Sequence, residues 1–390
     1  MKKRLILHIL LALLPFTLSA VVRTGADRQE EYIPLLTGKR VGLVVNHTAV
    51  LSRSGTHLLD TLLSQQVNVT AIFAPEHGFR GTADAGEAVK DSRDARTGLP
   101  VISLYGKNKK PTAGQVADID ILLFDIQDVG ARFYTYISTL LYVMQTCAET
   151  RTPIIILDRP NPNDHIDGPV LKEELKSFVG TMPLPVLHGL TIGELALMIA
   201  GEQWCGAEAP DVTVIPVSGW KHGDPYSLPV KPSPNLPDDQ AVAYYPSLCF
   251  FEATRISVGR GTLYPFQVIG YPDPKYGKFS FTPRSLPGFD KNPLQKDKKC
   301  FGVDLRNIPA PQGLSLKYLL DFYRTSGLGT DFFSSPSFFD KLMGDKQVRL
   351  DILNGKDESF IRSRWTKELA QYRKMRQAYL LYPDSREDSR

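Results

Sequence analysis

The sequence predicts an α/β fold in which a doubly wound parallel sheet is followed by a smaller α+β domain. Three observations support this prediction. Apolar runs alternate with helical segments over the first half of the chain. These runs are continuously apolar, which is typical of strands buried on both faces. The chain of 390 residues is also too long for one ordinary core, so two domains are expected.

Six apolar runs are the candidate strands of the sheet. Strands that are separated by helical segments form parallel sheets with crossover connections. Residues 56–65 and 138–150 have the pattern of such helices. Residues 21–222 are therefore predicted to form a Rossmann-like domain. Its candidate strands are 41–45, 69–73, 101–105, 121–124, 154–157 and 212–215.

The second half of the chain has a different pattern. Prolines recur in residues 223–239, which are predicted to be a linker. Beyond it, residues 240–390 are expected to form an α+β domain that closes a cleft. Its candidate elements are strands at 249–256 and 266–269 and helices at 316–325 and 359–377.

Residues 1–20 have the layout of a secretory signal peptide. Lys2, Lys3 and Arg4 precede an apolar stretch, Leu5 to Leu14, that is short for a membrane span. We therefore expect export to the periplasm or the cell exterior, with an uncleaved anchor as the alternative. Removal of this segment lowers the formal net charge from +4 to +1 (4 − 3). That balance gives no electrostatic reason to expect nucleic acid or an anionic membrane as a partner.

The four cysteines are widely spaced and form no C-x-x-C pair. Export would permit disulfides, but a chain of this size can fold without them. The sequence leaves their pairing open, and it leaves the oligomeric state open as well. The residues are Cys147, Cys205, Cys249 and Cys300.

Polar side chains follow directly on four of the apolar runs. In an open parallel sheet, ligands bind outside the carboxyl ends of the strands, so these clusters are expected to converge on one cleft. They are rich in carboxylate and imidazole, which favours a binding site over ordinary loop starts. The clusters are Asn46 and His47; Glu76 and His77; Asp125 and Asp128; and Asp158, Arg159 and Asn161.

Glu76 is the main candidate for a catalytic acid. It lies between Pro75 and the pair His77-Gly78, which would hold it in a fixed turn. A carboxylic acid can protonate a glycosidic oxygen, whereas the alternative is a loop carboxylate that binds backbone amides. Its partner could be a second carboxylate or, as in exceptional glycosidases, a tyrosine that otherwise packs in the core. The candidates are Asp125, Asp128, Glu252 and Tyr134.

Other polar residues are candidates for substrate binding. Arg260 lies in a small-residue loop, and its guanidinium matches a carboxylate, although a surface salt bridge is the alternative for it and for Arg255. His188 could bind a sugar hydroxyl or fill its loop. Glu194 has the spacing of a helix capping box, which explains it without chemistry. The remaining candidates are Asn46, His47, His77, Arg132, Asp158 and Asn161.

Several signatures of other chemistries are missing from the sequence. There is no Walker loop and no G-x-G-x-x-G after the first strand, so the sequence lacks the usual motifs of nucleotide binding. G-x-S-x-G and H-E-x-x-H are also missing. His47, His77, Asp125 and Asp158 could form a metal site, but their spacing has no metal signature. The sequence therefore predicts neither a metal nor another cofactor.

Four segments resemble those of the exo-β-N-acetylmuramidase family, the NamZ-like glycoside hydrolases of peptidoglycan turnover. They occur in the same order, and the resemblance covers nearly the whole chain after the signal peptide. Each segment is short, but together they are specific. They are FAPEHGFRG at 73–81, FDIQDVGARFYTY at 124–136, LDRPNP at 157–162 and GRGT at 259–262.

The resemblance implies a Rossmann-like domain, a smaller second domain and a cleft between them. It also implies release of terminal β-linked N-acetylmuramic acid, or a short unit containing it, from peptidoglycan fragments without a nucleotide or metal cofactor. The family's proposed catalytic glutamate falls on Glu76, and the lactyl carboxylate of the sugar gives Arg260 a ligand. Stereochemistry, product length and tolerance of stem peptides stay open.

Two other functions remain open at this level. An exported sugar-binding protein without catalysis would suit two lobes around a cleft equally well, because a fold does not decide a function. A metal-dependent hydrolase is the third interpretation. The concentration of carboxylates at the strand ends favours an enzyme.

Overall fold

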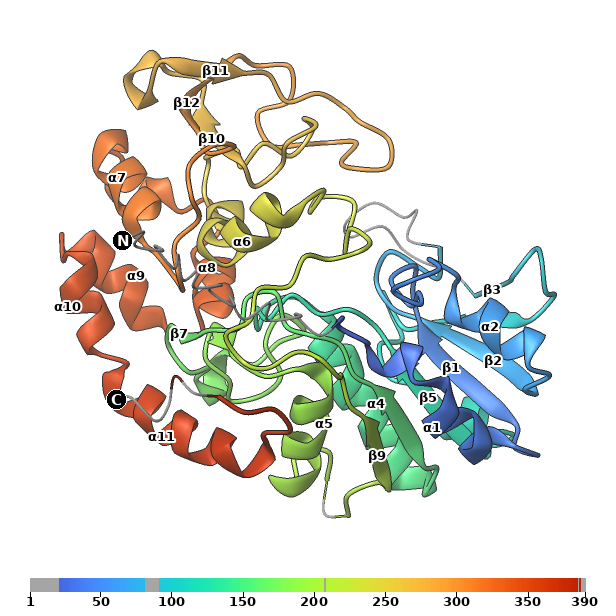
Figure 1. The fold of residues 1–390 in the computed structure, drawn as a ribbon. Coiled ribbons are helices and arrows are strands. Elements are labelled where there is room, and N and C mark those ends of the chain that lie inside the picture. Colours follow the sequence, from blue (N-terminus) through green and yellow to red (C-terminus); the bar gives the residue numbers. More distant parts are fainter. Residues whose placement is uncertain (1–20, 81–90, 207, 385, 387–390) are drawn as a thin grey trace, which may run out of the picture.

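The computed structural model describes residues 21–80, 91–206, 208–384 and 386. The predicted signal peptide at 1–20 lies outside these residues. Figure 1 shows the large sheet on one side of the molecule, with the helices and the small sheet of the second half on the other. In the described part of the chain, no helix has the length and apolar character needed to span a bilayer.

A seven-stranded sheet organises the described part of the first half. Its order is β3-β4-β2-β1-β5-β6-β9, and all neighbours are parallel except β3 with β4. The six parallel strands, numbered along the chain, thus have the order 3-2-1-4-5-6 of a Rossmann sheet, which confirms the predicted fold class. The strands are β1 (Val41–Val45), β2 (Val69–Ala74), β3 (Ser92–Arg93), β4 (Pro100–Ser103), β5 (Ile121–Asp125), β6 (Ile154–Leu157) and β9 (Val212–Ile215).

Helices cover both faces of this sheet, as a doubly wound fold requires. Alternate strand residues point to opposite faces. Val44 and Phe124 belong to the core cluster that contains α4 and α5, whereas Leu43 and Leu123 belong to the cluster that contains α2. The helices of this half are α1 (Gln29–Tyr32), α2 (Leu58–Ser64), α3 (Ala113–Val116), α4 (Tyr136–Thr150) and α5 (Ile192–Gly201).

The second half has the predicted α+β character. Its antiparallel sheet has the order β10-β12-β11, and helices pack below it. A separate two-stranded antiparallel sheet belongs to the first half and pairs β7 (Ile166–Asp167) with β8 (Leu187–His188). The helices and strands of the second half are α6 (Asp239–Leu248), β10 (Val268–Tyr271), β11 (Phe279–Phe281), β12 (Cys300–Asp304), α7 (Lys317–Ser326), α8 (Pro336–Met343), α9 (Lys346–Leu353), α10 (Glu358–Ser363) and α11 (Thr366–Arg376).

Two sequence-based element predictions in this half were wrong. The predicted strand at 249–256 is a 3-10 turn, Cys249–Ala253, that continues directly from α6. A short apolar run alone does not distinguish a buried strand from a buried helical segment. The predicted helix at 359–377 is divided into α10 and α11, because the chain turns before α11 and buries Trp365.

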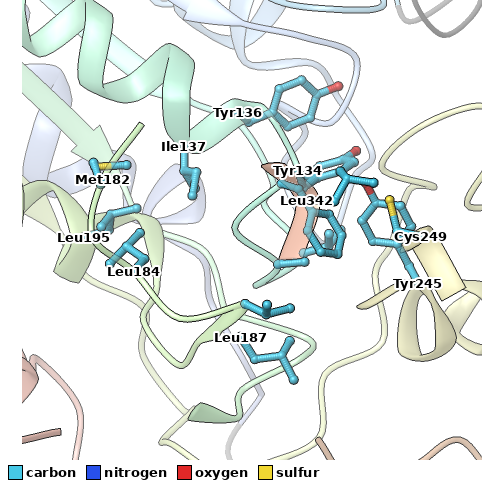
Figure 2. Close-up of a cluster of buried hydrophobic side chains, with 14 of the residues drawn as sticks. Tyr134, Tyr136, Ile137, Met182, Leu184, Leu187, Leu195, Tyr245, Cys249 and Leu342 are labelled. Atoms are coloured by element: carbon cyan, nitrogen blue, oxygen red, sulfur yellow. The ribbon is translucent and has the colours of Figure 1, made fainter. Parts of the chain in front are cut away.

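One hydrophobic core joins the two halves. Tyr245 and Cys249 of the second half pack against Tyr134 of the first, and Leu342 of α8 belongs to the same cluster. Figure 2 shows these side chains together, with Tyr136 beside them. The proline-rich stretch 223–239 is part of this arrangement, since Leu236 is buried. The four cysteines are buried free thiols.

Candidate active site

A pocket of about 380 Å³ lies where the two halves of the chain meet. Both halves contribute polar side chains to it, which is typical of a site that binds a ligand between domains. Those that the sequence singled out are Glu76, His77, Tyr134, Glu252 and Arg260.

A larger hollow of about 920 Å³ lies between α10, α11 and residues 165–167. Its carboxylates are already paired, because Asp167 binds Arg362 and Asp384 binds Arg386. The hollow contains none of the sequence-predicted site residues. Size alone therefore does not identify the active site, and the chemistry favours the smaller pocket.

Glu76 lies just beyond the carboxyl end of β2. His77 and Gly78 both have positive φ angles, of 68° and 72°, which turn the chain sharply after Glu76. The Gly78 amide donates to the Pro75 carbonyl at 3.0 Å and closes the turn. The Glu76 side chain is half-buried, and Thr135 Oγ1 donates to its Oε2 at 2.8 Å. The turn and Thr135 together hold this carboxyl group at the wall of the pocket.

Two phenols border Glu76. Burial raises the pKa of Tyr105, and the charge of Glu76 and a hydrogen bond with it raise that pKa further. Burial also raises the pKa of Tyr136, with Glu76 as the next cause. Both phenols are therefore neutral at physiological pH. Tyr105 was not singled out from the sequence, although it follows β4 at the same edge of the sheet as Glu76.

Tyr134 lines the pocket but is poorly suited to be a nucleophile. Its hydroxyl donates to the Pro232 carbonyl at 2.8 Å. Burial raises its pKa well above the ordinary value, and the neighbouring Tyr136 and Tyr245 add to this effect. A phenolate would have to form without solvent and with loss of that hydrogen bond. The structure therefore favours the packing interpretation of this residue.

Arg260 and Glu252 lie on the part of the pocket wall that belongs to the second half. Arg260 Nε donates to Glu252 Oε1 at 2.5 Å, and the Arg260 guanidinium lies 5.2 Å from the centroid of Phe266. Burial opposes the charge of Arg260, but Glu252 outweighs burial and raises the pKa of the arginine. Arg260 Nη1 is buried and has no hydrogen-bond partner within the described part of the chain. A buried donor of this kind requires an acceptor, which a ligand can supply.

The two aspartates proposed as partners of Glu76 do not line the pocket. Asp125 is fully buried and binds Arg159 through both oxygens, at 2.5 and 2.8 Å. Asp128 accepts from the Gly130 amide at 2.6 Å and lies 3.3 Å from His188 Nε2. Asp125 is thus paired within the fold, whereas Asp128 Oδ1 is buried without a hydrogen-bond partner among the described residues, and a catalytic role for either aspartate stays a prediction.

The other residues after β1 and β6 also serve the fold. Asn46 Oδ1 accepts from the Thr48 amide and hydroxyl. Asn161 Nδ2 donates to the Leu190 carbonyl at 3.0 Å. Asp158 accepts from Thr191 Oγ1 and the Gly193 amide, both at 2.7 Å, and burial raises its pKa to about 6. Long-range hydrogen bonds thus direct Asn161 and Asp158 into the protein, whereas the bonds of Asn46 are local and its Nδ2 is buried without a partner among the described residues.

Arg132 was predicted to bind substrate and instead supports the pocket from behind. It is fully buried and donates to the carbonyl oxygens of Pro169, Leu184 and Leu342. Burial lowers its pKa to about 9. Because Leu342 lines the pocket, this guanidinium connects the pocket wall of the second half to the first.

Of the three histidines predicted to bind substrate, one lines the pocket and two form hydrogen bonds within the fold. His77 lines the pocket. His47 Nε2 lies 2.9 Å from the Lys231 carbonyl, and burial lowers the pKa of this ring. His188 Nδ1 accepts from the Leu190 amide at 3.2 Å, so this side chain stabilises its own loop. Across the described residues, no His, Cys, Asp or Glu side chains form a group of three or more that could hold a metal ion.

The capping-box interpretation of Glu194 is confirmed. Thr191 is the N-cap of α5 and bonds to the Glu194 amide, while the Glu194 carboxylate accepts from the Thr191 amide. The same carboxylate also lies 2.9 Å from His222 Nε2. Arg255, on the surface, donates to the Asp331 carbonyl and takes no part in the pocket.

Comparison with known proteins identifies the family. The model for the N-terminal part of exo-β-N-acetylmuramidase NamZ matches residues 41–240, and the model for its C-terminal part matches residues 243–382. The two matches follow each other in order and leave little of the described chain uncovered.

The chain belongs to the NamZ family of exo-β-N-acetylmuramidases.

Three individual proteins are similar to this chain over most of their length. The peptidoglycan β-N-acetylmuramidase NamZ of Bacillus subtilis (strain 168) is 40% identical over 389 residues, which covers 93% of this chain and 91% of that protein. Crystal structures of two DUF1343 family proteins from Bacteroides fragilis share the fold. One is 45% identical with a TM-score of 0.86, the other 30% identical with a TM-score of 0.81, and each match covers 93% of this chain and 99% of the other.

Proposed function

We propose that Glu76 is the general acid with which this exo-acting β-N-acetylmuramidase releases terminal N-acetylmuramic acid from peptidoglycan fragments. Membership of the NamZ family and the identity with the Bacillus subtilis enzyme support the reaction. Of the functions that the sequence left open, these comparisons therefore favour the hydrolase. The observation that supports the role of Glu76 is that it shares one pocket with Arg260.

The chemistry requires a proton at the leaving oxygen. As the bond between C1 of the sugar and the glycosidic oxygen breaks, that oxygen takes a proton, and water then supplies the hydroxyl at C1. The carboxyl group of Glu76 is fixed by Thr135 and half-exposed to the pocket. Asp125 and Asp128 do not line this pocket, which favours Glu76 as the proton donor.

Arg260 is proposed to bind the lactyl carboxylate of N-acetylmuramic acid. A guanidinium pairs with a carboxylate through charge-assisted hydrogen bonds. Glu252 holds Nε of Arg260, while Nη1 still requires an acceptor. N-acetylglucosamine lacks the lactyl group and would leave this buried donor unsatisfied, which costs binding free energy. This contact would therefore distinguish a muramide from a glucosaminide.

A direct test compares a chromogenic β-N-acetylmuramide with the matching β-N-acetylglucosaminide. We expect cleavage of the muramide and its loss in Glu76→Gln, which nearly preserves shape but removes the proton donor. Glu149→Gln is the matched control, because Glu149 pairs with Lys110 on the surface away from the pocket. Full activity of Glu76→Gln would show that another group is the acid.

Arg260→Gln tests the second role. It should raise KM for the muramide and reduce the preference for muramide over glucosaminide. An unchanged preference would assign the recognition of the lactyl group to other residues.

Export is the remaining part of the proposal. The basic and apolar pattern of residues 1–20 supports secretion to the periplasm or the cell exterior. Cell fractionation of the wild-type chain and of a variant lacking residues 2–20 would test it. Equal retention of both chains in the cytoplasm would contradict export.

A further inference from the structure

Ring contacts give an order to one side of the pocket. The Arg260 guanidinium lies over Phe266, whose ring centroid is 5.0 Å from that of Tyr245. Tyr245 lies 5.8 Å from Tyr134, which directly precedes the threonine that donates to Glu76. This series of contacts connects the arginine to the carboxyl group along the pocket lining.

A second series leads from Glu76 to a pair of aromatic rings. Glu76 and Tyr105 are hydrogen-bonded, and the Tyr105 ring centroid lies 6.1 Å from that of Phe178 at an interplanar angle of 50°. Both rings line the pocket and are partly exposed. The two series therefore meet at Glu76, one leading to Arg260 and the other to the aromatic pair.

The Phe178 ring is held in place by its surroundings. Phe178 and Val179 are the central residues of a tight turn, which two hydrogen bonds of 2.9 and 3.0 Å between Ser177 and Gly180 close. Ser138 Oγ donates to the Phe178 carbonyl at 2.8 Å. Tyr142 stacks on the ring with an interplanar angle of 11°. A ring that is ordered in this way can bind a ligand with little loss of conformational entropy.

We propose that Tyr105 and Phe178 form the subsite for the leaving group and bind a neutral pyranose by stacking. This inference rests on the proposed roles of Glu76 and Arg260. A general acid protonates the oxygen that joins the two sugars, so those sugars lie on opposite sides of it. With the muramic acid held by Arg260, the leaving sugar lies on the side of the two rings.

The chemistry of these residues suits a neutral sugar. The C–H face of a pyranose is apolar and packs on an aromatic ring, while its hydroxyl groups remain available for hydrogen bonds. Lys109 Nζ lies over the Phe178 ring, 5.0 Å from its centroid, so a sugar that stacks on that face takes the place of the lysine, whose ammonium can then donate to the sugar hydroxyl groups. Binding free energy from this sugar, which does not itself react, can lower the barrier at the glycosidic bond.

The test compares two substrates that differ in the leaving group. One is the disaccharide in which N-acetylmuramic acid is β-linked to N-acetylglucosamine, and the other is β-N-acetylmuramyl fluoride, which has no leaving ring. We expect Phe178→Leu to lower the ratio of kcat/KM for disaccharide over fluoride at least tenfold. Phe178→Trp keeps a stacking surface and should restore most of the ratio.

Phe360→Leu is the matched control. Phe360 is 41% exposed on α10, away from the pocket, so neither rate should change. An unchanged ratio in Phe178→Leu would overturn the leaving-group subsite, and so would an equal loss for both substrates. Failure of the proposed function gives a different result, because Glu76→Gln would then keep full activity on the disaccharide.

Discussion

Asp125 and Glu76 occupy equivalent places in the sheet and have opposite surroundings. Asp125 ends β5 and Glu76 follows β2, so both lie at the carboxyl edge where a Rossmann sheet binds ligands. Asp125 is fully buried and binds a guanidinium through both oxygens. Glu76 is half-buried at the pocket wall, and the hydroxyl groups of Thr135 and Tyr105 form hydrogen bonds with it.

This difference separates charges that serve the fold from one that can serve catalysis. The ion pair of Asp125 with Arg159 also holds the Val50 carbonyl, and so connects the loops after β1, β5 and β6. A carboxylate that is compensated in this way has no capacity for another ligand. The carboxyl group of Glu76 lines the pocket, so it is placed to exchange a proton with a substrate.

Glu76→Gln should produce the largest effect. General acid catalysis contributes about 10²–10⁴-fold, so kcat/KM for a muramide should fall by roughly this factor. The midpoint of thermal unfolding should change little, because the amide preserves the shape and can still accept from Thr135. Steady-state kinetics and thermal melts of the same preparation would measure both. A large fall in the melting midpoint would place Glu76 with the structural charges.

Asp125→Ala should mainly affect stability. Removal of one partner of a buried ion pair leaves the other charge buried and unpaired, which costs about 3–5 kcal/mol of unfolding free energy. Urea denaturation would measure this loss. Asp118→Ala is the control, since Asp118 binds Arg40 at 3.0 Å but is 96% exposed, and an exposed pair contributes at most about 1 kcal/mol. If both variants lost the same unfolding free energy, the buried ion pair of Asp125 would contribute no more to stability than the exposed pair of Asp118.

His222 makes the stability of the structural charge network depend on pH. Burial alone would lower its pKa, but hydrogen bonds with Asp164 and Glu194 raise it to about 9. Arg376 Nη2 lies 3.2 Å from the same ring and opposes its protonation.

A histidine pKa raised in the folded state stabilises the protein fully below the unfolded value of about 6.5, and the contribution disappears as pH rises through the folded value. The free energy of unfolding should therefore fall by about 3 kcal/mol more in the wild type than in His222→Gln between pH 6 and pH 10. Denaturation curves at several pH values would measure this difference. If the free energy of unfolding changed with pH in the same way in the wild type and in His222→Gln, His222 would not be the titrating group.

Thr135→Val should give the smallest effect of the four. It removes the hydroxyl that donates to Glu76 Oε2 and that stabilises the carboxylate formed when the acid gives up its proton. One hydrogen bond to a charged group is worth about 1.5 kcal/mol, so kcat/KM should fall about tenfold. Thr135→Ser keeps the donor and should retain nearly full activity. If the serine variant lost as much activity as the valine variant, the methyl group rather than the hydrogen bond would be important.

Much of the framework could be predicted from the sequence. All six apolar runs are strands of the main sheet, because continuous burial requires continuous apolar sequence. The turn after Glu76 follows from local residues, since Gly78 readily adopts a positive φ. The capping box at Thr191 and Glu194 is equally local. Such features depend on residues that are close in the chain.

The tertiary structure alone decided which polar residues face the pocket. Asp125 forms an ion pair with Arg159, 34 residues away. Arg132 donates to the Leu342 carbonyl, 210 residues away, and so points away from the pocket. Phe178 and Glu252 reach the pocket from segments that have no catalytic motif. The sequence by itself therefore determined the sheet, the family motifs and the candidate acid. Which charges are compensated depends on long-range contacts, because solvation and pairing are properties of the folded surroundings rather than of the local sequence.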